Sequence, residues 1–341
     1  MKIGVVGASG YSGGELLRLL LNHPEFSIDY IAAGSSAGEA ITSVHPHLQE
    51  FSGRAFEETD LAKMSECALL FFALPHGESA KYIAELPSEI KIVDLGADYR
   101  LNNCDQWAKY YGGSHAGSWV YGSPELPGQR DKIKNASRVA NPGCYATAIN
   151  LAIAPAIASG VIDASDIVVV ASSGVTGAGR SAKISLLGSE TMNSLTSYKF
   201  GGVHQHTPEV EQALSSIGGG DVRISFTPIL APMPRGILAT VTAKLTSNTD
   251  TAQIRSMYEK FYSDSVFVSL LAEGEMPRTS STLGSNSVHL QIAIDAHTNR
   301  LIVSSALDNL GKGAASAAIQ NANLISGYAE DLGVPTVGVR S

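Results

Sequence analysis

The 341-residue chain has few charged residues, three cysteines and no long apolar run. Charged residues make up 16% of it and the formal net charge is −8, which excludes the basic surface that nucleic-acid binding requires. No apolar stretch approaches a membrane span, and the chain opens directly into an expected strand rather than a signal peptide. Hydrophobic residues reach 44%. We therefore expect a cytoplasmic globular protein with a large core and no nucleic-acid or membrane partner.

The cysteines exclude two further classes of protein. Cys67, Cys104 and Cys144 lack the spacing of a metal site, and their odd number does not suggest a disulfide framework. A reducing compartment and the absence of a bound metal are the simple expectations.

The first third of the chain alternates short apolar strands with helical stretches. Strands are expected at 2–6, 26–33, 68–73 and 91–95, with a helix at 15–22 after the first strand. Strands so continuously apolar suit the middle of a parallel sheet. The alternation predicts an α/β fold with a Rossmann-type doubly wound parallel sheet.

Beyond residue 144 the pattern changes to longer strands. They are expected at 167–171, 222–229, 236–245, 288–296 and 301–305, the last two forming a hairpin. This half predicts an α+β domain with a mixed or antiparallel sheet. The two domains are expected at 1–143 and 144–310. The C-terminal segment 311–341, which begins with an Ala-rich helix at 311–327, is expected to complete the first domain.

A glycine-rich turn follows the first strand and opens the first helix, which is the context of a dinucleotide-binding turn. Its spacing is GxxGxxG rather than GxGxxG. Glycine lets the backbone approach a pyrophosphate, and the helix N-terminus attracts its charge. A purely structural tight turn is the alternative. We expect cofactor contacts from Gly7, Ser9, Gly10, Tyr11, Ser12 and Gly13.

The end of the second strand indicates which dinucleotide is bound. NAD enzymes usually place a carboxylate there for the ribose 2′-hydroxyl. Here the strand is followed by Ser35 and Ser36, and Asp29 comes too early. Hydroxyl groups do not repel a 2′-phosphate, so Ser35 and Ser36 favour NADP as the cofactor, although no arginine stands beside them.

A single cysteine stands where a turn meets a buried helix. Pro142 and Gly143 form the turn before Cys144, and the run 146–158 is apolar and Ala-rich. Unpaired N–H groups and the positive end of the helix dipole favour the thiolate, which is the nucleophilic form. A small buried cysteine without chemistry is the alternative interpretation.

Two histidines, His204 and His206, lie on one side of an extended segment. Pro208 is expected to begin the next helix with Thr207 as its N-cap. A metal pair would need a third ligand, and none has suitable spacing. A hydrogen-bonded loop and a general acid/base for the thiolate remain the two interpretations.

Arginines beside glycine and proline follow the ends of several strands. Arg100, Arg180 and Arg235 are candidate forks for a carboxylate or phosphate, and each could instead be a surface charge. Asn141, in the turn before Cys144, is grouped with them as a candidate substrate ligand.

Eight short motifs in this order resemble the N-acetyl-γ-glutamyl-phosphate reductases, the arginine-biosynthesis branch of the aspartate-semialdehyde dehydrogenase-like family. They are GASGYSG at 7–13, DLGADYR at 94–100, NPGCY at 141–145, SG at 173–174 with GAGR at 177–180, HQHTPE at 204–209, PMPRG at 232–236, GSN at 284–286 and DNLGKG at 308–313. The set spans nearly the full chain.

The resemblance implies an NADPH-dependent reduction of an acyl phosphate to an aldehyde, with release of inorganic phosphate. It implies that Cys144 forms a thioester and that the histidine pair is the acid/base, where we favour His206. It places the phosphate at Arg100, substrate contacts at Arg180 and Arg235, and a cofactor contact at Asn309. It also implies that domain 1–143 binds NADP and that domain 144–310 is catalytic and forms a homodimer or homotetramer.

One departure concerns the histidine pair, since the family commonly has arginine where this chain has Gln205. If that arginine holds substrate, glutamine weakens the hold or changes its preference. Reductases of the homologous N-acetyl-aminoadipyl or aspartyl phosphates, a CoA-dependent acylating aldehyde dehydrogenase and a non-catalytic nucleotide sensor are the alternatives. The acyl-chain length of the substrate stays open at this stage.

Overall fold

The computed structural model describes residues 1–218 and 220–339, which divide into two compact units. The first unit comprises Met1–Pro124, Gly128–Pro142 and Ala314–Val334. The second comprises Glu125–Pro127, Gly143–Gly313 and the described residues from 335 onward. The chain therefore changes unit immediately before Gly143. Of the segment 311–341 expected to complete the first domain, Ala314–Val334 belongs to the first unit, whereas residues 311–313 and 335–339 belong to the second. Residues 340 and 341 lie outside the described residues.

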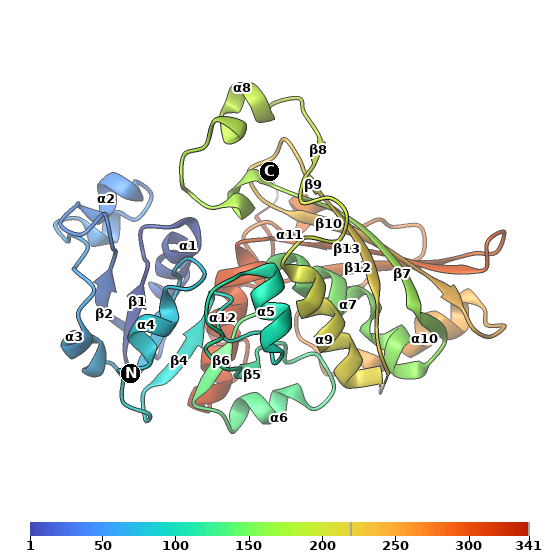
Figure 1. Cartoon of the computed structure of the whole chain (residues 1–341), viewed down its shortest axis with the longest axis horizontal. Coiled ribbons are helices and arrows are strands. Elements are labelled where there is room, and N and C mark those ends of the chain that lie inside the picture. Colours follow the sequence, from blue (N-terminus) through green and yellow to red (C-terminus); the bar gives the residue numbers. More distant parts are fainter. Residues whose placement is uncertain (219, 340–341) are drawn as a thin grey trace. The chain divides into compact units, whose positions relative to one another are not determined.

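The first unit is built on a six-stranded parallel sheet in the order β2-β1-β3-β4-β6-β5 (Figure 1). Its strands are β1 Lys2–Val6, β2 Ser27–Ala32, β3 Leu69–Phe72, β4 Lys91–Asp94, β5 Val120–Tyr121 and β6 Arg138–Ala140. Its helices are α1 Tyr11–Leu20, α2 Ile41–Val44, α3 Leu61–Ser65, α4 Ser79–Ile83, α5 Cys104–Tyr110, α6 Gln129–Lys134 and α12 Ser316–Ser326. The expected doubly wound parallel sheet is confirmed.

Helices pack on this sheet because its strands are apolar on both faces. All four residues of β3 are buried, and α1 and α12 contact β1 and β4 respectively. The Ala-rich C-terminal helix thus belongs to the first unit, as expected, but it is shorter than 311–327. A π-helical turn covers Gly311–Ala315 before α12 begins at Ser316.

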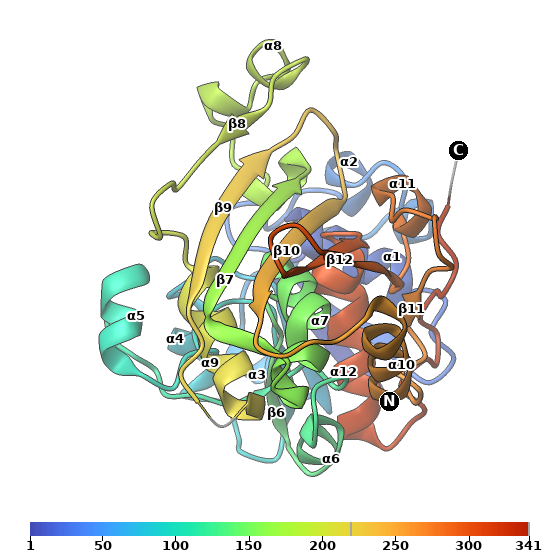
Figure 2. The ribbon, with the colours of Figure 1, turned by 90° about the vertical axis from the view of Figure 1, so that its right-hand side faces the viewer.

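The second unit contains a seven-stranded mixed sheet in the order β11-β12-β13-β10-β7-β9-β8. Its strands are β7 Ile162–Ser173, β8 Thr196–Ser197, β9 Ile224–Leu230, β10 Ile237–Leu245, β11 Val268–Leu270, β12 Val288–Asp295 and β13 Arg300–Leu307. The expected hairpin is the antiparallel pair β12–β13, and β7 pairs in parallel with β9. Figure 2 shows β7, β9 and β10 side by side.

Helix α7, Cys144–Ser159, packs against β7, β10 and β13 of this sheet. Thirteen of its sixteen residues are buried, so it is apolar all round, as a core helix must be. The other helices of the unit are α8 Gly188–Thr191, α9 His206–Gly218, α10 Thr251–Phe261 and α11 Thr279–Thr282. The prediction of a buried helix here is confirmed, and the helix begins two residues earlier than expected.

Two helix starts differ from expectation. Helix α1 begins at Tyr11 instead of residue 15, so Gly13 lies inside it. Helix α9 begins at His206, so the prediction of Thr207 as its N-cap is wrong. The backbone N–H of His206 donates to Nδ1 of His204 at 3.1 Å, so an imidazole nitrogen serves where a hydroxyl was expected.

Candidate active site

The glycine-rich turn of the first unit joins the carboxyl end of β1 to α1. Gly7 has a φ of +86°, and the N–H groups of Gly7 and Ala8 donate to the Ala32 carbonyl at the end of β2. A Cβ on Gly13 would lie 2.6 Å from both Ala8 Cα and the Gly7 carbonyl oxygen. The turn therefore needs glycine at its first and last positions so that helix and strand can meet closely.

Helix α1 presents its bare amino end at this turn. Its N-cap, Gly10, supplies no side-chain hydrogen bond, and the first-turn N–H groups lack intrahelical partners by geometry. A Cβ on Gly10 would come no closer than 3.7 Å to the protein. An open helix terminus bearing positive partial charge fits an anionic pyrophosphate. Ser9 and Ser12 are half-buried at this terminus, and Tyr11 is exposed.

Ser35 and Ser36 follow the end of β2, where Ser35 is exposed and Ser36 half-buried. The predicted site at the adenosine ribose thus presents hydroxyl groups. Asp29 lies at the third residue of β2 and pairs with Lys2. Glu57, whose backbone N–H bonds the Ile31 carbonyl, is paired with Lys63 at 2.6 Å. Both carboxylates are therefore paired with lysines, which offsets the repulsion they would exert on a 2′-phosphate. The segment thus fits NADP.

His45 supports the turn from within the unit. It is buried, and its Nε2 lies 2.9 Å from the Ala8 carbonyl oxygen. Because a carbonyl only accepts, Nε2 carries the proton in this contact. The imidazole also lies where a Cβ on Gly14 would have to go, at 2.4 Å. The histidine therefore fixes the turn through packing and one hydrogen bond.

Arg100 ends a loop that follows β4 and is buried. Its Nε donates to the Asn141 carbonyl and its Nη2 to the Leu95 carbonyl, both at 2.8 Å. The Asn141 side chain donates to Ala314 O and accepts from Asn321 Nδ2. The structure thus brings together Arg100 and Asn141, the two predicted substrate ligands of this unit. Asn141 lies three residues before Cys144 in the chain. Their polar groups are used partly to hold the loop itself.

Two buried carboxylates, Asp94 and Asp98, brace the same loop. Ser79 Oγ lies 3.0 Å from Asp94 and 2.9 Å from Asp98, and Asp98 also accepts from Gly77 N and Ala80 N. Burial, together with the charge of Asp98, raises the pKa of Asp94 to about 7. A hydroxyl has one proton to donate, so a protonated Asp94 completes a chain through Ser79 to Asp98.

In the second unit, Cys144 is the first residue of α7 and is partly exposed. The N-cap, Gly143, supplies no side chain, so the thiol lies at an open helix terminus. First-turn N–H groups and the helix dipole favour negative charge at this point. The position suits both a thiolate and the oxyanion of a tetrahedral intermediate.

The imidazole of His206 packs against Gly143, the residue before Cys144. A Cβ on Gly143 would lie 2.3 Å from His206 Nε2, so only glycine allows this approach. The Gly143 N–H donates to Glu209 Oε1 at 2.7 Å, and Glu209 is fully buried. Helices α7 and α9 pack together along their length. Glu209 therefore holds the start of α7 against the start of α9.

His204 occupies a different environment from His206. It is 5% exposed and surrounded by the rings of Tyr145, Tyr198 and Phe226 at centroid distances of 5.1 to 5.7 Å. Burial, with the nearby charges of His206 and Lys199, lowers its pKa to about 2. A histidine that stays neutral and caps α9 through Nδ1 is a poor proton carrier. The geometry therefore favours His206 for the acid/base role.

The remaining predicted residues of the second unit lie in connecting loops. Arg235 makes a bidentate ion pair with the fully buried Asp308, at 3.0 and 2.6 Å. Asn309 accepts from Gly236 N and donates to Thr176 Oγ1. Arg180 is exposed beyond the 3-10 turn Val175–Ala178. Arg235 and Asn309 thus tie loops together, and their roles toward ligands stay predictions.

Sequence reasoning missed Glu209 and Tyr198. Glu209 was visible as the acid of HQHTPE, three residues after His206 and hence on the same helix face. Tyr198 carried no signal, because its hydroxyl partner Tyr145 is 53 residues away.

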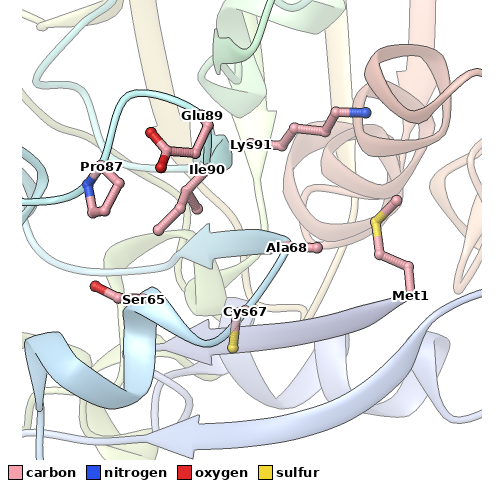
Figure 3. Close-up of a pocket in the computed structure, with 8 residues that line it drawn as sticks. All are labelled: Met1, Ser65, Cys67, Ala68, Pro87, Glu89, Ile90 and Lys91. Atoms are coloured by element: carbon pink, nitrogen blue, oxygen red, sulfur yellow. The ribbon is translucent and has the colours of Figure 1, made fainter.

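A cavity of about 330 Å³ lies at the amino ends of β1, β3 and β4 (Figure 3). It is lined by Met1, Ser65, Cys67, Ala68, Pro87, Glu89, Ile90 and Lys91. Ligands of doubly wound sheets bind at the carboxyl ends of the strands, where the glycine-rich turn lies. This cavity is therefore at the wrong edge for the cofactor.

In the described part of the chain, no helix is both long and apolar enough to cross a membrane. Among the same residues, no group of three histidine, cysteine or acidic side chains is placed to hold a metal ion.

The chain matches two family models. Residues 2–136 match the semialdehyde dehydrogenase NAD binding domain, and residues 144–309 match the semialdehyde dehydrogenase dimerisation domain. Two relatives are named N-acetyl-gamma-glutamyl-phosphate reductase. That of Acidothermus cellulolyticus is 54% identical over 99% of this chain and 98% of its own length. That of Saccharopolyspora erythraea is 50% identical over 99% of both.

Solved structures with low identity share the fold. Aspartate semialdehyde dehydrogenase II from Vibrio cholerae has a TM-score of 0.71 at 19% identity, covering 95% of this chain and 98% of its own. Aspartate semialdehyde dehydrogenase with NADP from Candida albicans has a TM-score of 0.69 at 16% identity, covering 97% and 99%. Both support the two-domain fold derived above.

Proposed function

Because this chain belongs to the N-acetyl-gamma-glutamyl-phosphate reductase family, we propose that it reduces N-acetyl-γ-glutamyl phosphate to N-acetylglutamate semialdehyde with NADPH, releasing inorganic phosphate in arginine biosynthesis. The observation that carries the proposal is the placement of Cys144 at the open start of α7, with the His206 imidazole against Gly143.

The first half of the reaction is an acyl transfer to sulfur. The Cys144 thiolate attacks the acyl carbon, the C–O bond to phosphate breaks, and a thioester forms. His206, protonated by the thiol when the thiolate formed, gives that proton to the leaving phosphate. N–H groups in the first turn of α7 donate to the developing oxyanion. Arg100, with Asn141 beside it, is the proposed phosphate ligand, and Arg180 and Arg235 are weaker candidates for substrate contacts.

The bound cofactor supplies the hydride for the second half. Its pyrophosphate would be held by the first turn of α1 together with Gly7, Gly10 and Gly13, and Ser9, Tyr11 and Ser12 would contribute at the same turn. The hydroxyl groups of Ser35 and Ser36 would donate to the 2′-phosphate. Asn309 is the proposed contact from the second unit. The tetrahedral thiohemiacetal collapses by breaking its C–S bond, which releases the aldehyde and returns Cys144 as thiolate. His206 regains a proton from solvent.

A steady-state assay in the reverse direction tests this mechanism. NADP reduction is followed with N-acetylglutamate semialdehyde, with and without phosphate, in the wild type, Cys144→Ala and the control Cys104→Ala, which removes an exposed cysteine. We expect phosphate-dependent activity that falls at least about a thousandfold in Cys144→Ala and stays unchanged in the control. Equal activity without phosphate, or activity that survives Cys144→Ala, contradicts the proposal. Aspartate semialdehyde and the aminoadipate homologue in the same assay test the acyl-chain preference.

We also propose that the protein forms a homodimer through the exposed face of the second sheet. A homotetramer is the alternative assembly. Val168 and Val170 of β7 lie on one face with Leu238 of β10, and they are 37%, 43% and 37% exposed. A family model called a dimerisation domain covers this sheet. Val170→Glu should yield monomers in sedimentation velocity, whereas an unchanged sedimentation coefficient excludes this face.

The chemistry fits the cytoplasm, which is our proposed location. Among the described residues the three cysteines are unbridged, and a thiolate nucleophile needs a reducing compartment.

A further inference from the structure

Lys199 holds an unusual backbone conformation close to the histidine pair. Its φ is +44°, and the other non-glycine residues with positive φ in the described chain, Asn193 and Asn299, are asparagines, which tolerate this region better. The preceding residue, Tyr198, holds it in place, because its backbone N–H donates to the Pro228 carbonyl and its Oη donates to Tyr145 Oη. Strain that neighbours maintain in this way is often found at functional sites.

The Lys199 side chain reaches the segment that carries the histidines. Its Nζ donates to Oε1 of Gln205, the residue between His204 and His206. The charge on Lys199 also contributes to the lowered pKa of His204. Lys199 is thus held at its backbone by Tyr198, which bonds Tyr145 next to Cys144, and at its side chain by Gln205. The glutamine that departs from the common family motif thus positions a cation in this chain.

This cation has no acidic partner among the described residues. Lys2, Lys63, Lys81 and Lys312 each pair with a carboxylate, whereas the partner of Lys199 is a neutral amide. Burial and the neighbouring charge of Lys183 lower the pKa of Lys199. A lysine with no compensating carboxylate favours the approach of an anion.

The position also indicates which anion binds. The two imidazoles lie 4.8 Å apart, and Gln205 alternates with them along the chain. Lys199 bonds the side chain of Gln205, which lies between the two histidines in the chain. Since Arg100 and Asn141 are the proposed ligands of the phosphate, the other anionic group of the substrate, its α-carboxylate, is the one left for Lys199.

We propose that the Lys199 ammonium, oriented by Gln205, binds the α-carboxylate of the substrate and so selects an acyl chain that carries a carboxylate at its far end. This inference rests on the proposed function. It makes Lys199 a substrate-binding residue and Gln205 a positioning residue. An ammonium–carboxylate hydrogen bond of this kind corresponds to roughly a 10- to 100-fold change in affinity.

The test uses Lys199→Met, Lys199→Arg and the control Lys183→Met, an exposed lysine of the same segment. The substrates are N-acetylglutamate semialdehyde and 4-acetamidobutanal, which lacks only the carboxylate. For Lys199→Met we expect KM for the semialdehyde to rise roughly 10- to 100-fold, with kcat and KM for phosphate nearly unchanged. Lys199→Arg should recover most of the loss. With 4-acetamidobutanal, the wild type and Lys199→Met should have the same kcat/KM.

Three results overturn this proposal while leaving the proposed function intact. The first is an equal loss with both aldehydes, which gives Lys199 a role unrelated to the carboxylate. The second is a KM for the semialdehyde that Lys199→Met does not change although the wild type is active. The third is a Lys199→Met enzyme in which KM for phosphate is the constant that changes. A wild type without phosphate-dependent activity overturns the proposed function, and the assignment of Lys199 with it.

Discussion

Helices α1 and α7 both begin after a glycine that makes no side-chain capping hydrogen bond, one in each unit. The two glycines have similar extended conformations, with φ of −75° at Gly10 and −70° at Gly143. At Gly10 a Cβ would make only an ordinary contact, 3.7 Å from the Gly7 carbonyl oxygen, whereas Gly143 is in contact with the His206 imidazole and its N–H donates to Glu209. We therefore propose that the same kind of helix terminus binds an anion through its backbone in one unit and carries side-chain chemistry in the other.

This difference shows what a helix dipole does and does not determine. The dipole makes both termini attractive to negative charge. What distinguishes the termini is the set of side chains packed against them. At α7 a thiol, an imidazole and a buried carboxylate meet at Gly143 and Cys144, whereas at α1 the His45 imidazole packs on Gly14 and the Ala8 carbonyl and leaves Gly10 uncovered.

Gly143→Ala should have the largest effect of the substitutions that leave Cys144 in place. Its methyl group would lie 2.3 Å from His206 Nε2, so the imidazole has to move. A displacement of about 1 Å at a reacting group costs roughly a hundredfold in rate, and we expect kcat to fall by about that factor. Steady-state kinetics measures it, with the far-ultraviolet circular dichroism spectrum as a check on folding. A kcat within threefold of the wild type, a margin of about 0.7 kcal/mol, would show that His206 is not held against Gly143.

Glu209→Ala should affect stability and rate together. It removes the acceptor of the buried Gly143 N–H, and an unsatisfied buried donor costs about 1–3 kcal/mol. Urea unfolding measures the loss. The matched control is Glu211→Ala on the same helix, whose carboxylate accepts from the part-buried Ile224 N–H. If both variants lose the same stability and neither loses activity, Glu209 has no special part in holding the start of α7.

The pH dependence of stability should test whether His204 stays neutral in the folded protein. Because its folded pKa lies well below 6.5, His204 stabilises the folded protein above pH 6.5, and this contribution is lost as the pH falls and the unfolded chain takes up a proton. His204→Asn keeps an acceptor for the start of α9 but cannot titrate. The difference in unfolding free energy between wild type and variant should therefore shrink by about 1.4 kcal/mol per pH unit below 6.5.

Asp94 acts in the opposite sense. Its pKa is raised to about 7, so its contribution is present at low pH and is lost as the pH rises through 7. Since Asp94 is the same in both proteins, its effect cancels in the comparison. A difference between wild type and His204→Asn that does not vary from pH 7.5 to pH 5.5 would contradict a neutral, buried His204.

Gly10→Ala should have the smallest effect on the protein itself. The added methyl group meets nothing closer than 3.7 Å, and the φ of −75° suits alanine. We expect a loss of about half a kcal/mol or less in thermal or urea unfolding. Any larger change should appear in KM for NADP, because the open space at Gly10 is where the pyrophosphate is proposed to bind. A stability loss as large as that of Glu209→Ala would remove the contrast between the two termini.

The sequence predicts both sheets and the buried helix after Cys144, because these follow from apolar runs and periodicity. It fails at the starts of α1 and α9. The turn pattern of Gly7, Gly10 and Gly13 made residues 11–14 look non-helical, yet Gly13 is required inside α1 for close packing on Ala8. At α9 the preference of threonine for N-caps gave the wrong start, because His204 supplies the capping atom.

The site residues show the same limit. Cys144 and the histidine pair could be proposed as site residues because each stands in a short motif, and the structure brings His206 against Gly143. The partners could not: Glu209 meets Gly143 across 66 residues, and Arg235 meets Asp308 across 73. A loop arginine that looks free to bind an anion in the sequence can thus prove to be paired within the fold. Long-range polar contacts of this kind depend on tertiary packing, which local patterns do not encode.

The central claim is that Cys144 carries the acyl group as a thioester. The direct test is mass spectrometry of the protein after mixing it with N-acetylglutamate semialdehyde and NADP in the absence of phosphate. We expect one N-acetylglutamyl group on the peptide that contains Cys144, formed together with one equivalent of NADPH and released when phosphate is added. Turnover on addition of phosphate without any acylated Cys144 peptide beforehand, or acylation of a different residue, would contradict the account.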